Sequence, residues 1–299
     1  MPVDIERISS QQTAVEMGIT QVRDLCQLRQ AVLASCLHII VADGKYGNHR
    51  FLGPLRDLNC GLLVRMRCDR VLYREPGAYS GRGRPRVHGD RFAFKEPDTW
   101  HEPDQLVNLE HPKWGQVEIR FWKGLHARED TNTVFTVLCV QVHMERNHPP
   151  KPLWLGWIGP DLPADDLWIY YQHRWPVEPS IRWRKQQLLW TRPQFHDPEI
   201  GDRWTYLVTL AQWMLHLARP LVSDLPLPWQ AAQPPDKLTP GRVQLGLAPV
   251  FAQIGTPAAP PQTRGKSPGW PKGRKRTRAK RYAVVKKGAD SAKTARKVA

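Results

Sequence analysis

The sequence lacks the features that would place the chain in a membrane, outside the cell or around a structural zinc ion. It has no apolar run of about eighteen residues, so no membrane-spanning helix is expected. Its first residues carry neither the basic nor the apolar region of a signal peptide. The five cysteines are scattered and form no Cys-x-x-Cys pair, which argues against structural zinc and favours a reduced compartment. We therefore expect a cytoplasmic protein with no membrane partner.

Acidic residues are also scarce, and the shortage is concentrated at one end of the chain. The formal net charge is +16. Residues 264–299 contain 14 Lys and Arg against a single acid, whereas the other 263 residues carry 30 basic and 27 acidic side chains. Such a polycationic tail, which includes Arg274, Lys275 and Arg276, binds phosphate backbones without reading base sequence. The alternative is a solvated, disordered terminus with no particular partner.

Apolar periodicity divides the remaining chain into an α/β part, a β-rich part and a helical part. A helix is expected over 11–35, a buried and parallel strand over 36–42, a short helix over 48–57 and a second buried strand over 61–66. Residues 69–113, rich in Arg, Gly and Pro, predict an exposed loop. Strands are expected over 117–122, 133–143 and 152–158. This order of elements is typical of an α/β fold.

From residue 165 the pattern becomes helical and then rich in proline. The clearest helix is predicted over 202–219, with an apolar face made of Trp204, Leu207, Ala211, Met214, Leu215 and Ala218. Another short helix is expected to begin near 238–243, and disorder from about residue 258. We expect five regions: an α/β core (1–68), a loop and β-rich insertion (69–164), a helical region (165–225), a Pro-rich linker (226–263) and a basic tail (264–299).

Asp43 is the first candidate site residue, because it follows an apolar strand directly. In open α/β sheets, ligands bind at the carboxyl ends of the strands, so a carboxylate there could hold a metal ion. The alternative is that Asp43-Gly44 simply makes a turn or caps the next helix.

Glu178 is the second candidate, because it is a lone carboxylate among cations. On a helix, Arg174, Glu178, Arg182 and Lys185 would share one face. A carboxylate in such a setting suits a metal ligand beside a phosphate; the alternative is a surface helix with ordinary ion pairs. Prolines flank Glu178, so the helix is expected to begin near residue 176, with Arg174 before it. Trp175, Trp183 and Trp190 could stack on bases, although a core role is expected for at least two of them.

These residues carry a resemblance to a known family. Tyr171, two residues, Arg174, three residues, Glu178, six residues and Lys185 reproduce the Y-R-E-K signature of bacterial DDE-type insertion-sequence transposases. The segments 41–46 and 185–193 also resemble members of that family. The similarity extends from about residue 1 to about residue 245.

The resemblance implies a ribonuclease H-like sheet with a β-rich insertion and a two-metal site for Mg²⁺. By resemblance, Asp43 is the second catalytic aspartate, Glu178 is the third acid, and both are metal ligands. Tyr171, Arg174, Arg182 and Lys185 would bind DNA. The first aspartate and its strands have no counterpart before Asp43, so the fold is expected to be incomplete and the chain to be an N-terminally truncated copy.

Three functions remain open from the sequence. The first is a transposase that cuts and joins DNA at transposon ends and targets, located at the bacterial nucleoid, with a homodimer on DNA left open. The second is a catalytically inactive remnant that still binds DNA. The third is a basic nucleic-acid-binding protein without nuclease ancestry, which the Y-R-E-K motif disfavours.

Overall fold

The computed structural model describes residues 2–32, 36–79, 81, 83–144, 150–254 and 272–273, and it describes residues 29–32 and 254 by their backbone alone. The chain forms two compact units. We call residues 12–175 the sheet unit, and residues 1–11 together with 176–299 the helical unit. The expected disorder after residue 258 lies almost wholly outside the described residues.

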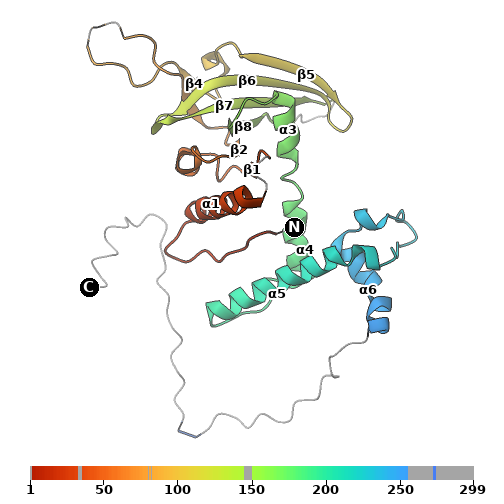
Figure 1. Ribbon diagram of the computed structural model, residues 1–299. Helices are drawn as coiled ribbons and strands as arrows, with labels where there is room; N and C mark the ends of the chain where they lie inside the picture. Colours follow the sequence, from red (N-terminus) through yellow and green to blue (C-terminus); the bar gives the residue numbers. More distant parts are fainter. Residues whose placement is uncertain are drawn as a thin grey trace. The chain divides into compact units, whose positions relative to one another are not determined.

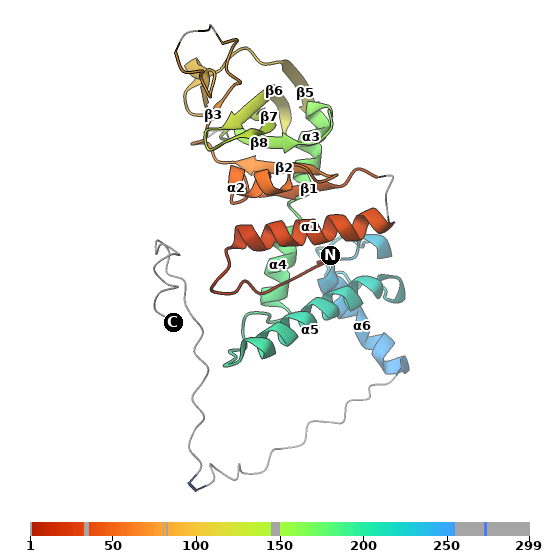
Figure 2. The same cartoon turned by 60° about the vertical axis from the view of Figure 1, so that its left-hand side comes forward.

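The sheet unit is built on one eight-stranded sheet (Figures 1 and 2). Hydrogen bonds join the strands in the order β1-β2-β8-β7-β6-β3-β4, and β5 pairs with β6 beside this path. The β1–β2 pair is parallel and every other pair is antiparallel. With helices on both faces, the fold is mixed α/β, as the sequence predicted. The strands are β1 (Ile39–Ala42), β2 (Gly61–Met66), β3 (Val71–Tyr73), β4 (Arg91–Ala93), β5 (Gln105–His111), β6 (Gly115–Ala127), β7 (Asp130–His143) and β8 (Leu153–Ile158).

Strand β1 forms one edge of the sheet, and within the described residues its hydrogen-bonded neighbour is β2 alone. The parallel pairing is confirmed, with Ile39 opposite Gly61 and Ala42 opposite Val64. The expectation of full burial was wrong, since all four residues of β1 are half-buried. The apolar run reflects contacts on both faces, but the free edge of the strand leaves each side chain partly open to solvent.

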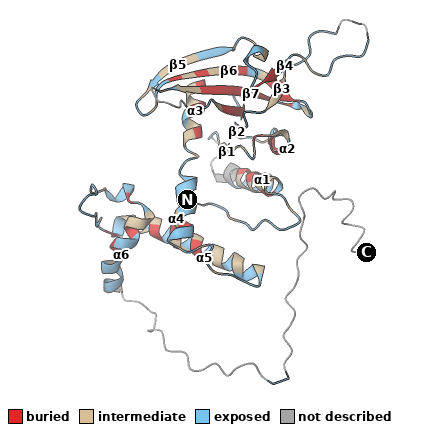
Figure 3. Ribbon diagram, turned by 180° about the vertical axis from the view of Figure 1, so that it is seen from behind, coloured by how far each residue is buried: buried red, intermediate tan, exposed pale blue. Residues whose placement is uncertain are grey.

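Helices cover the two faces of the sheet. Helix α1 (Ala14–Val32) and helix α2 (His49–Leu52), which continues as the 3₁₀ turn η1 (Gly53–Leu55), pack on one face, and α3 (Ala164–Gln172) packs on the other. A capping box starts α1: Glu16 N donates to Thr13 Oγ1 and Thr13 N donates to Glu16 Oε2. The burial colours of Figure 3 follow this sandwich, with the most buried residues inside the sheet unit.

The exposed loop expected over 69–113 was a wrong prediction in part. That stretch contains β3, β4, the 3₁₀ turn η2 (Pro97–Thr99) and β5. Leu72, Phe92 and Phe94 are buried, and the Phe94 ring stacks on Trp154 with the ring centroids 4.0 Å apart. Isolated apolar residues between arginines and glycines give no local periodicity. They are buried because β3 pairs with β6 and with β4, which brings these residues into the core of the sheet unit.

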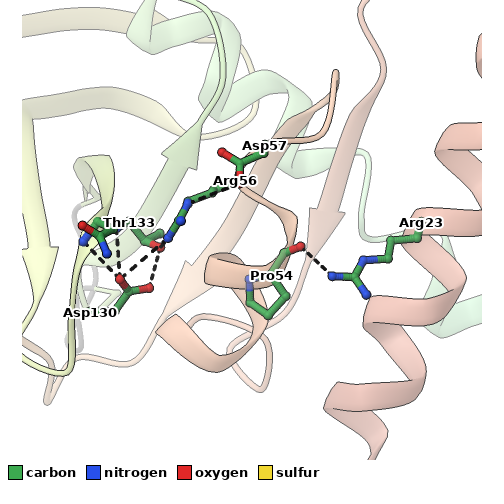
Figure 4. Close-up of polar contacts among 7 residues, drawn as sticks. Arg23, Pro54, Arg56, Asp57, Asp130 and Thr133 are labelled. Atoms are coloured by element: carbon green, nitrogen blue, oxygen red, sulfur yellow. Dashed lines mark hydrogen bonds and ion pairs between the residues drawn. The ribbon is translucent and has the colours of Figure 1, made fainter.

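A network of polar contacts links the segment after the 3₁₀ turn η1 to the β6–β7 hairpin (Figure 4). Asp130 Oδ2 accepts a 2.6 Å hydrogen bond from Thr133 Oγ1, and Arg56 lies 3.9 Å from Asp130 Oδ1. Burial raises the pKa of the Asp130 carboxyl, but hydrogen bonds from Thr133 and Asn132 and the charge of Arg56 outweigh it and hold the pKa below its usual value. Because the hairpin and the 3₁₀ turn are distant in sequence, this network stabilises tertiary rather than local structure.

The helical unit contains α4 (Val177–Gln186), α5 (Pro198–Leu217), the 3₁₀ turns η3 (Arg219–Leu221) and η4 (Pro235–Lys237), and α6 (Pro240–Ile254). Asp197 caps α5 by accepting from Glu199 N at 2.9 Å. A small core of Leu215, Val222, Leu238 and Val243 joins these elements.

The apolar face predicted for the 202–219 helix was wrong in part: Leu215 is buried and Ala218 packs against the small core, but Leu207 and Met214 are exposed. The buried residues of α5 are Val208, Gln212 and Leu215, while Leu207 and Met214 are 59% and 60% exposed. This helix is apolar around most of its circumference, so periodicity cannot select its packed side. The packing of α4 and α6 selects it instead. No described helix has the length and apolarity needed to cross a membrane.

Candidate nucleic-acid and metal site

Asp43 lies exposed at the carboxyl end of β1, at the start of a tight turn. Its Oδ1 accepts a 2.9 Å hydrogen bond from Lys45 N, and Tyr46 N donates to the Asp43 carbonyl. Gly47 lets this turn lie on β2, since a Cβ there would be 2.1 Å from the Arg65 carbonyl oxygen. The turn predicted as the alternative role of Asp43 therefore exists. It also fixes the carboxylate at the strand end.

Tyr171 and Arg174, two further predicted site residues, are related to Asp43 through the Tyr171 hydroxyl. The Tyr171 side chain is buried in the core between α3 and the sheet. Burial raises the pKa of the Tyr171 hydroxyl, and the negative charge of Asp43 raises it further. The positive charges of Arg174 and Arg65 and a hydrogen bond from Arg174 lower it. The Tyr171 hydroxyl is therefore hydrogen-bonded to Arg174 and lies within electrostatic range of Asp43 and Arg65. We call these four residues the strand-end cluster.

The strand-end cluster combines one carboxylate with two guanidinium groups at an exposed edge. Arg65 is exposed on β2, and the Arg174 guanidinium carbon is 5.9 Å from the centre of the Tyr171 ring. Arginine side chains beside a carboxylate can hold a phosphate while the carboxylate holds a cation. Sequence reasoning found Asp43, Tyr171 and Arg174 but missed Arg65. Its position in the middle of an apolar strand was the available signal.

The Y-R-E-K residues do not share one helix. Helix α3 ends at Gln172, single 3₁₀-type turns follow through Trp175, and α4 begins at Val177. Pro176, which has no backbone N–H, sits at the start of α4, so the expected beginning near residue 176 is confirmed. Tyr171 and Arg174 thus belong to the sheet unit. Glu178 and Lys185 belong to the helical unit.

One exposed face of α4 carries the other predicted site residues. Glu178 lies in the first turn, where a helix dipole favours a negative charge, and Lys185 lies in the last turn, where it favours a positive one. Arg182 is exposed between them, four residues after Glu178. We call Glu178, Arg182 and Lys185 the α4 face. Its spacing places a carboxylate and two cations on one side of a short helix.

Arg184 points to the opposite side and is buried. Its guanidinium lies over the Trp190 ring, 4.6 Å from the ring centre, and burial lowers its pKa. Within the described part of the chain, Arg184 Nε and Nη1 have no hydrogen-bond partner. Arg184 is therefore part of the packing of the helical unit and is not available to a phosphate.

Two of the three tryptophans have structural roles, as the sequence predicted. Trp183 packs against the small core, and Trp190 Nε1 donates to Thr205 Oγ1 at 3.0 Å, so both have structural roles. Trp175 is 61% exposed. It alone of the three keeps an open ring face for stacking.

A basic pocket that sequence reasoning missed lies near the carboxyl end of β2. This cavity of about 370 Å³ is lined by three arginines (Arg70, Arg91 and Arg128), by the two acids Asp69 and Glu129, and by Asn48 and His49 of the segment after β1. Glu96 binds Arg91 at 2.8 Å. Arg70 Nε is buried and has no hydrogen-bond partner among the described residues. The three arginines of the pocket come from separate segments of the chain, so only the tertiary fold brings them together.

The residues present fit a metal ion only in part. Asp43 is an exposed carboxylate whose Oδ1 accepts the turn hydrogen bond, and Mg²⁺ needs few carboxylates because it keeps several waters. No group of three His, Cys, Asp or Glu side chains suited to a metal occurs in the described ranges. The predicted tail residues Arg274, Lys275 and Arg276 lie outside the described residues.

One family model matches the N-terminal part of the chain. Residues 10–128 match the model of a family described as DDE superfamily endonuclease. The match includes Asp43, Arg65 and the three arginines of the basic pocket, ends before Tyr171 and spans less than half of the chain. No curated protein matches the chain. The matched region supports the superfamily, and with it nuclease- or transposase-type activity on DNA.

Proposed function

We propose that this chain is an insertion-sequence transposase that cleaves and transfers DNA strands at the ends of a mobile element. In this proposal Asp43 and Glu178 are metal ligands, and Mg²⁺ is the metal. A pair of such ions would stabilise the attacking and leaving oxygens of a phosphodiester during in-line displacement. DNA is the substrate, and a bacterial, nucleoid-associated location follows from it.

One observation carries the proposal. Asp43 stands at the carboxyl end of a sheet strand, inside the matched region, and Tyr171, which is hydrogen-bonded to Arg174, lies within electrostatic range of Asp43 and Arg65. That edge is where ligands of α/β sheets bind. The arginines would neutralise a phosphodiester held beside the carboxylate.

DNA contacts are proposed from three sources. Arg174 and Tyr171 of the strand-end cluster would hold one phosphate, and Arg182 and Lys185 of the α4 face would hold another. Residues 264–299, with Arg274, Lys275 and Arg276, would add affinity without sequence preference. Two copies acting on DNA as a homodimer would bring two ends together.

A second candidate is an inactive remnant that binds DNA without cutting it. The observation that favours it is the lack of a three-residue metal group in the described ranges. A two-metal site needs a further carboxylate, and among the described residues no strand pairs with the outer edge of β1, where the family's first strand would lie. That the first strands are missing stays a prediction. The nucleotide sequence upstream tests it through an in-frame or frameshifted strand with an Asp-x-Thr motif.

The test is metal-dependent nicking of supercoiled DNA and of transposon-end DNA by the full chain. Nicking with Mg²⁺, its loss with a chelator, and its loss in Asp43→Asn and Glu178→Gln are the expected results. Glu199→Gln is the matched control for Glu178, because both are exposed acids in the first turn of a helix in the same unit. Asp57→Asn, an exposed acid of the sheet unit, is the control for Asp43.

The two candidates give opposite outcomes. A folded chain that binds DNA but never nicks it contradicts the transposase proposal and supports the remnant. Nicking that disappears in Glu178→Gln but not in Glu199→Gln excludes the remnant.

A further inference from the structure

The connection between β3 and β4 is much longer than the strands that it joins. It comprises residues 74–90, whereas a hairpin connection usually takes about 2–5 residues. The structure describes residues 74–79, 81 and 83–90 of it, and Figures 1 and 3 show an exposed loop that extends beyond the end of the sheet. We call residues 74–90 the β3–β4 loop. Long surface loops on a rigid scaffold are common places for binding residues.

Contacts at both ends hold the stem of this loop to the sheet unit. Arg74 N donates to Asp90 O at 3.1 Å, and Gly89 N donates to Arg74 O at 2.8 Å. Gly89 permits this close approach, since a Cβ there would be 2.2 Å from a backbone carbonyl oxygen. The neighbouring His88 has its Nδ1 3.0 Å from Nε2 of the buried His126. The loop therefore begins and ends at fixed positions of the sheet unit.

The tip of the loop, residues 83–86, is strongly cationic. Between Glu75 and Asp90 the sequence contains arginines and no acidic residue. Arg84 and Arg86 are exposed, and within the described ranges neither guanidinium has a hydrogen-bond or ion-pair partner. Arg86 also lines a cavity of about 570 Å³ toward the stem, where acids and cations are mixed. The unbalanced positive charge therefore lies at the tip.

The backbone at the tip is narrow. Gly83 has a φ of +78°, a left-handed conformation that glycine adopts without strain, and the Tyr79 hydroxyl donates to the Gly83 carbonyl at 2.6 Å. Pro85 fixes its own φ and disfavours helical backbone at Arg84, so an extended chain from Arg84 to Arg86 is favoured. At about 3.3 Å per residue, the two arginines are spaced like two base-pair steps of B-DNA, each about 3.4 Å.

We propose that residues 83–86 bind the minor groove of A·T-rich DNA, with the side chains of Arg84 and Arg86 inserted into it. That groove is about 6 Å wide in B-DNA and narrower still in A-tracts, so it admits an extended Gly-Arg-Pro backbone and excludes a helix. A narrow minor groove also concentrates negative potential, which attracts arginine. Guanine places its N2 amino group in this groove, where it would obstruct the two guanidinium groups.

Two other partners fit the tip less well. Loops that bind a phosphate present successive backbone N–H groups to it, and Pro85 has none. Double-stranded RNA has a wide and shallow minor groove, which would not enclose an extended chain. The inference takes DNA as the partner from the proposed function, but it concerns base-dependent recognition by a loop outside the strand-end cluster and the α4 face.

The experiment is equilibrium binding of the full chain, without divalent metal, to labelled duplexes of equal length. The first duplex has an A·T-rich centre and the second a G·C-rich centre. The third has inosine in place of every guanine of the second, which removes the N2 amino group from the minor groove and leaves the acceptors of the major groove unchanged. We expect the first and third duplexes to bind on the order of tenfold more tightly than the second.

Substitutions separate groove recognition from overall charge. The double variant Arg84→Lys/Arg86→Lys keeps both charges but replaces each weakly hydrated guanidinium by a strongly hydrated ammonium. Its ratio of affinities for the A·T and G·C duplexes should fall close to one, while its salt dependence stays that of wild type. Arg50→Lys, which alters an exposed arginine of α2 in the same unit, is the matched control and should keep the wild-type ratio. Both variants should melt like wild type, because all three side chains are exposed.

Four results would overturn the proposal. They are equal affinity of the wild type for the A·T and G·C duplexes, an inosine duplex that binds like the G·C duplex, a double variant that keeps the wild-type ratio, and an equal loss in Arg50→Lys. Tighter binding to an A·U-rich RNA duplex of the same sequence would also overturn it and assign the loop to RNA. Nicking is measured separately, so a chain that prefers A·T-rich DNA but never nicks contradicts the proposed transposase activity and leaves this inference standing.

Discussion

Replacing Arg174 by Gln tests whether the strand-end cluster holds a DNA phosphate. The change removes a guanidinium that bonds to the Tyr171 hydroxyl, and it leaves the Tyr171 ring in its buried position. Arg174 is half-buried and lies between α3 and α4, outside the regular hydrogen bonding of either helix. The fold should therefore tolerate the substitution with a loss of about 1 kcal/mol or less.

The magnitude follows from counting phosphates. One phosphate contact contributes about 0.9 to the slope of log binding constant against log salt concentration on duplex DNA. Arg174→Gln should flatten the slope by about that amount. A hydrogen bond to a charged group contributes about 1.5–3 kcal/mol, so affinity at low salt should fall by roughly 10- to 100-fold and the deficit should shrink as salt rises.

The assay is fluorescence anisotropy of labelled duplex DNA over a series of salt concentrations. Arg50→Gln is the control, since Arg50 is an exposed arginine of the same unit on α2. A parallel ultraviolet titration follows the tyrosines. Because Arg174 opposes the rise that burial causes in the pKa of Tyr171, its removal should raise that pKa further.

The two readouts together decide the role of Arg174. If the Tyr171 pKa rises while the salt slope equals that of wild type, Arg174 only positions Tyr171 and the phosphate role is refuted. If Arg50→Gln flattens the slope equally, the effect is one of overall charge and not of the cluster.

Four further predictions concern other parts of the chain. Deleting residues 264–299 should weaken non-specific DNA binding and flatten its salt slope by several units, and an unchanged slope would show that the tail does not contact DNA. Asp130→Asn should cost about 1–2 kcal/mol of unfolding free energy at neutral pH. Because the pKa of Asp130 is lowered, this difference should be complete above about pH 4 and vanish as the pH falls through the folded-state pKa; a pH-independent difference in urea titrations would contradict it. Burial and the neighbouring His88 lower the pKa of His126, so stability should be complete above about pH 6.5 and decline as the pH falls below it, and His126→Gln should reduce that decline in melting curves. Arg184→Met, which replaces a buried unpaired cation by an apolar side chain of similar length, should leave the melting temperature unchanged or raise it, and a loss of several degrees would show that Arg184 has a partner essential to the fold.

Local patterns in the sequence predicted the elements whose signal is strong within a short window. The helix at α1, the strands β2, β6, β7 and β8, and the parallel character of β1 followed from apolar periodicity and run length. The start of α4 followed from proline chemistry at Pro176. In each case, the determining interaction is between residues close in the chain.

The tertiary structure decided which sides of those elements are covered. Strands β3 and β5 pair with β6, and β4 pairs with β3, and nothing in their local composition predicts these pairings. The buried side of α5 depends on α4 and α6, because the helix is apolar almost all round.

In the candidate site too, some residues were predictable from the local sequence and others were not. Asp43 and Glu178 were visible from spacing and composition, since a strand-end acid and a lone carboxylate among cations are local patterns. The gathering of Arg65, Tyr171 and Arg174 around Asp43, and of three arginines in the basic pocket, joins segments more than twenty residues apart. Electrostatic neighbours of this kind are set by how the sheet folds, because charge interactions act through space and not along the chain.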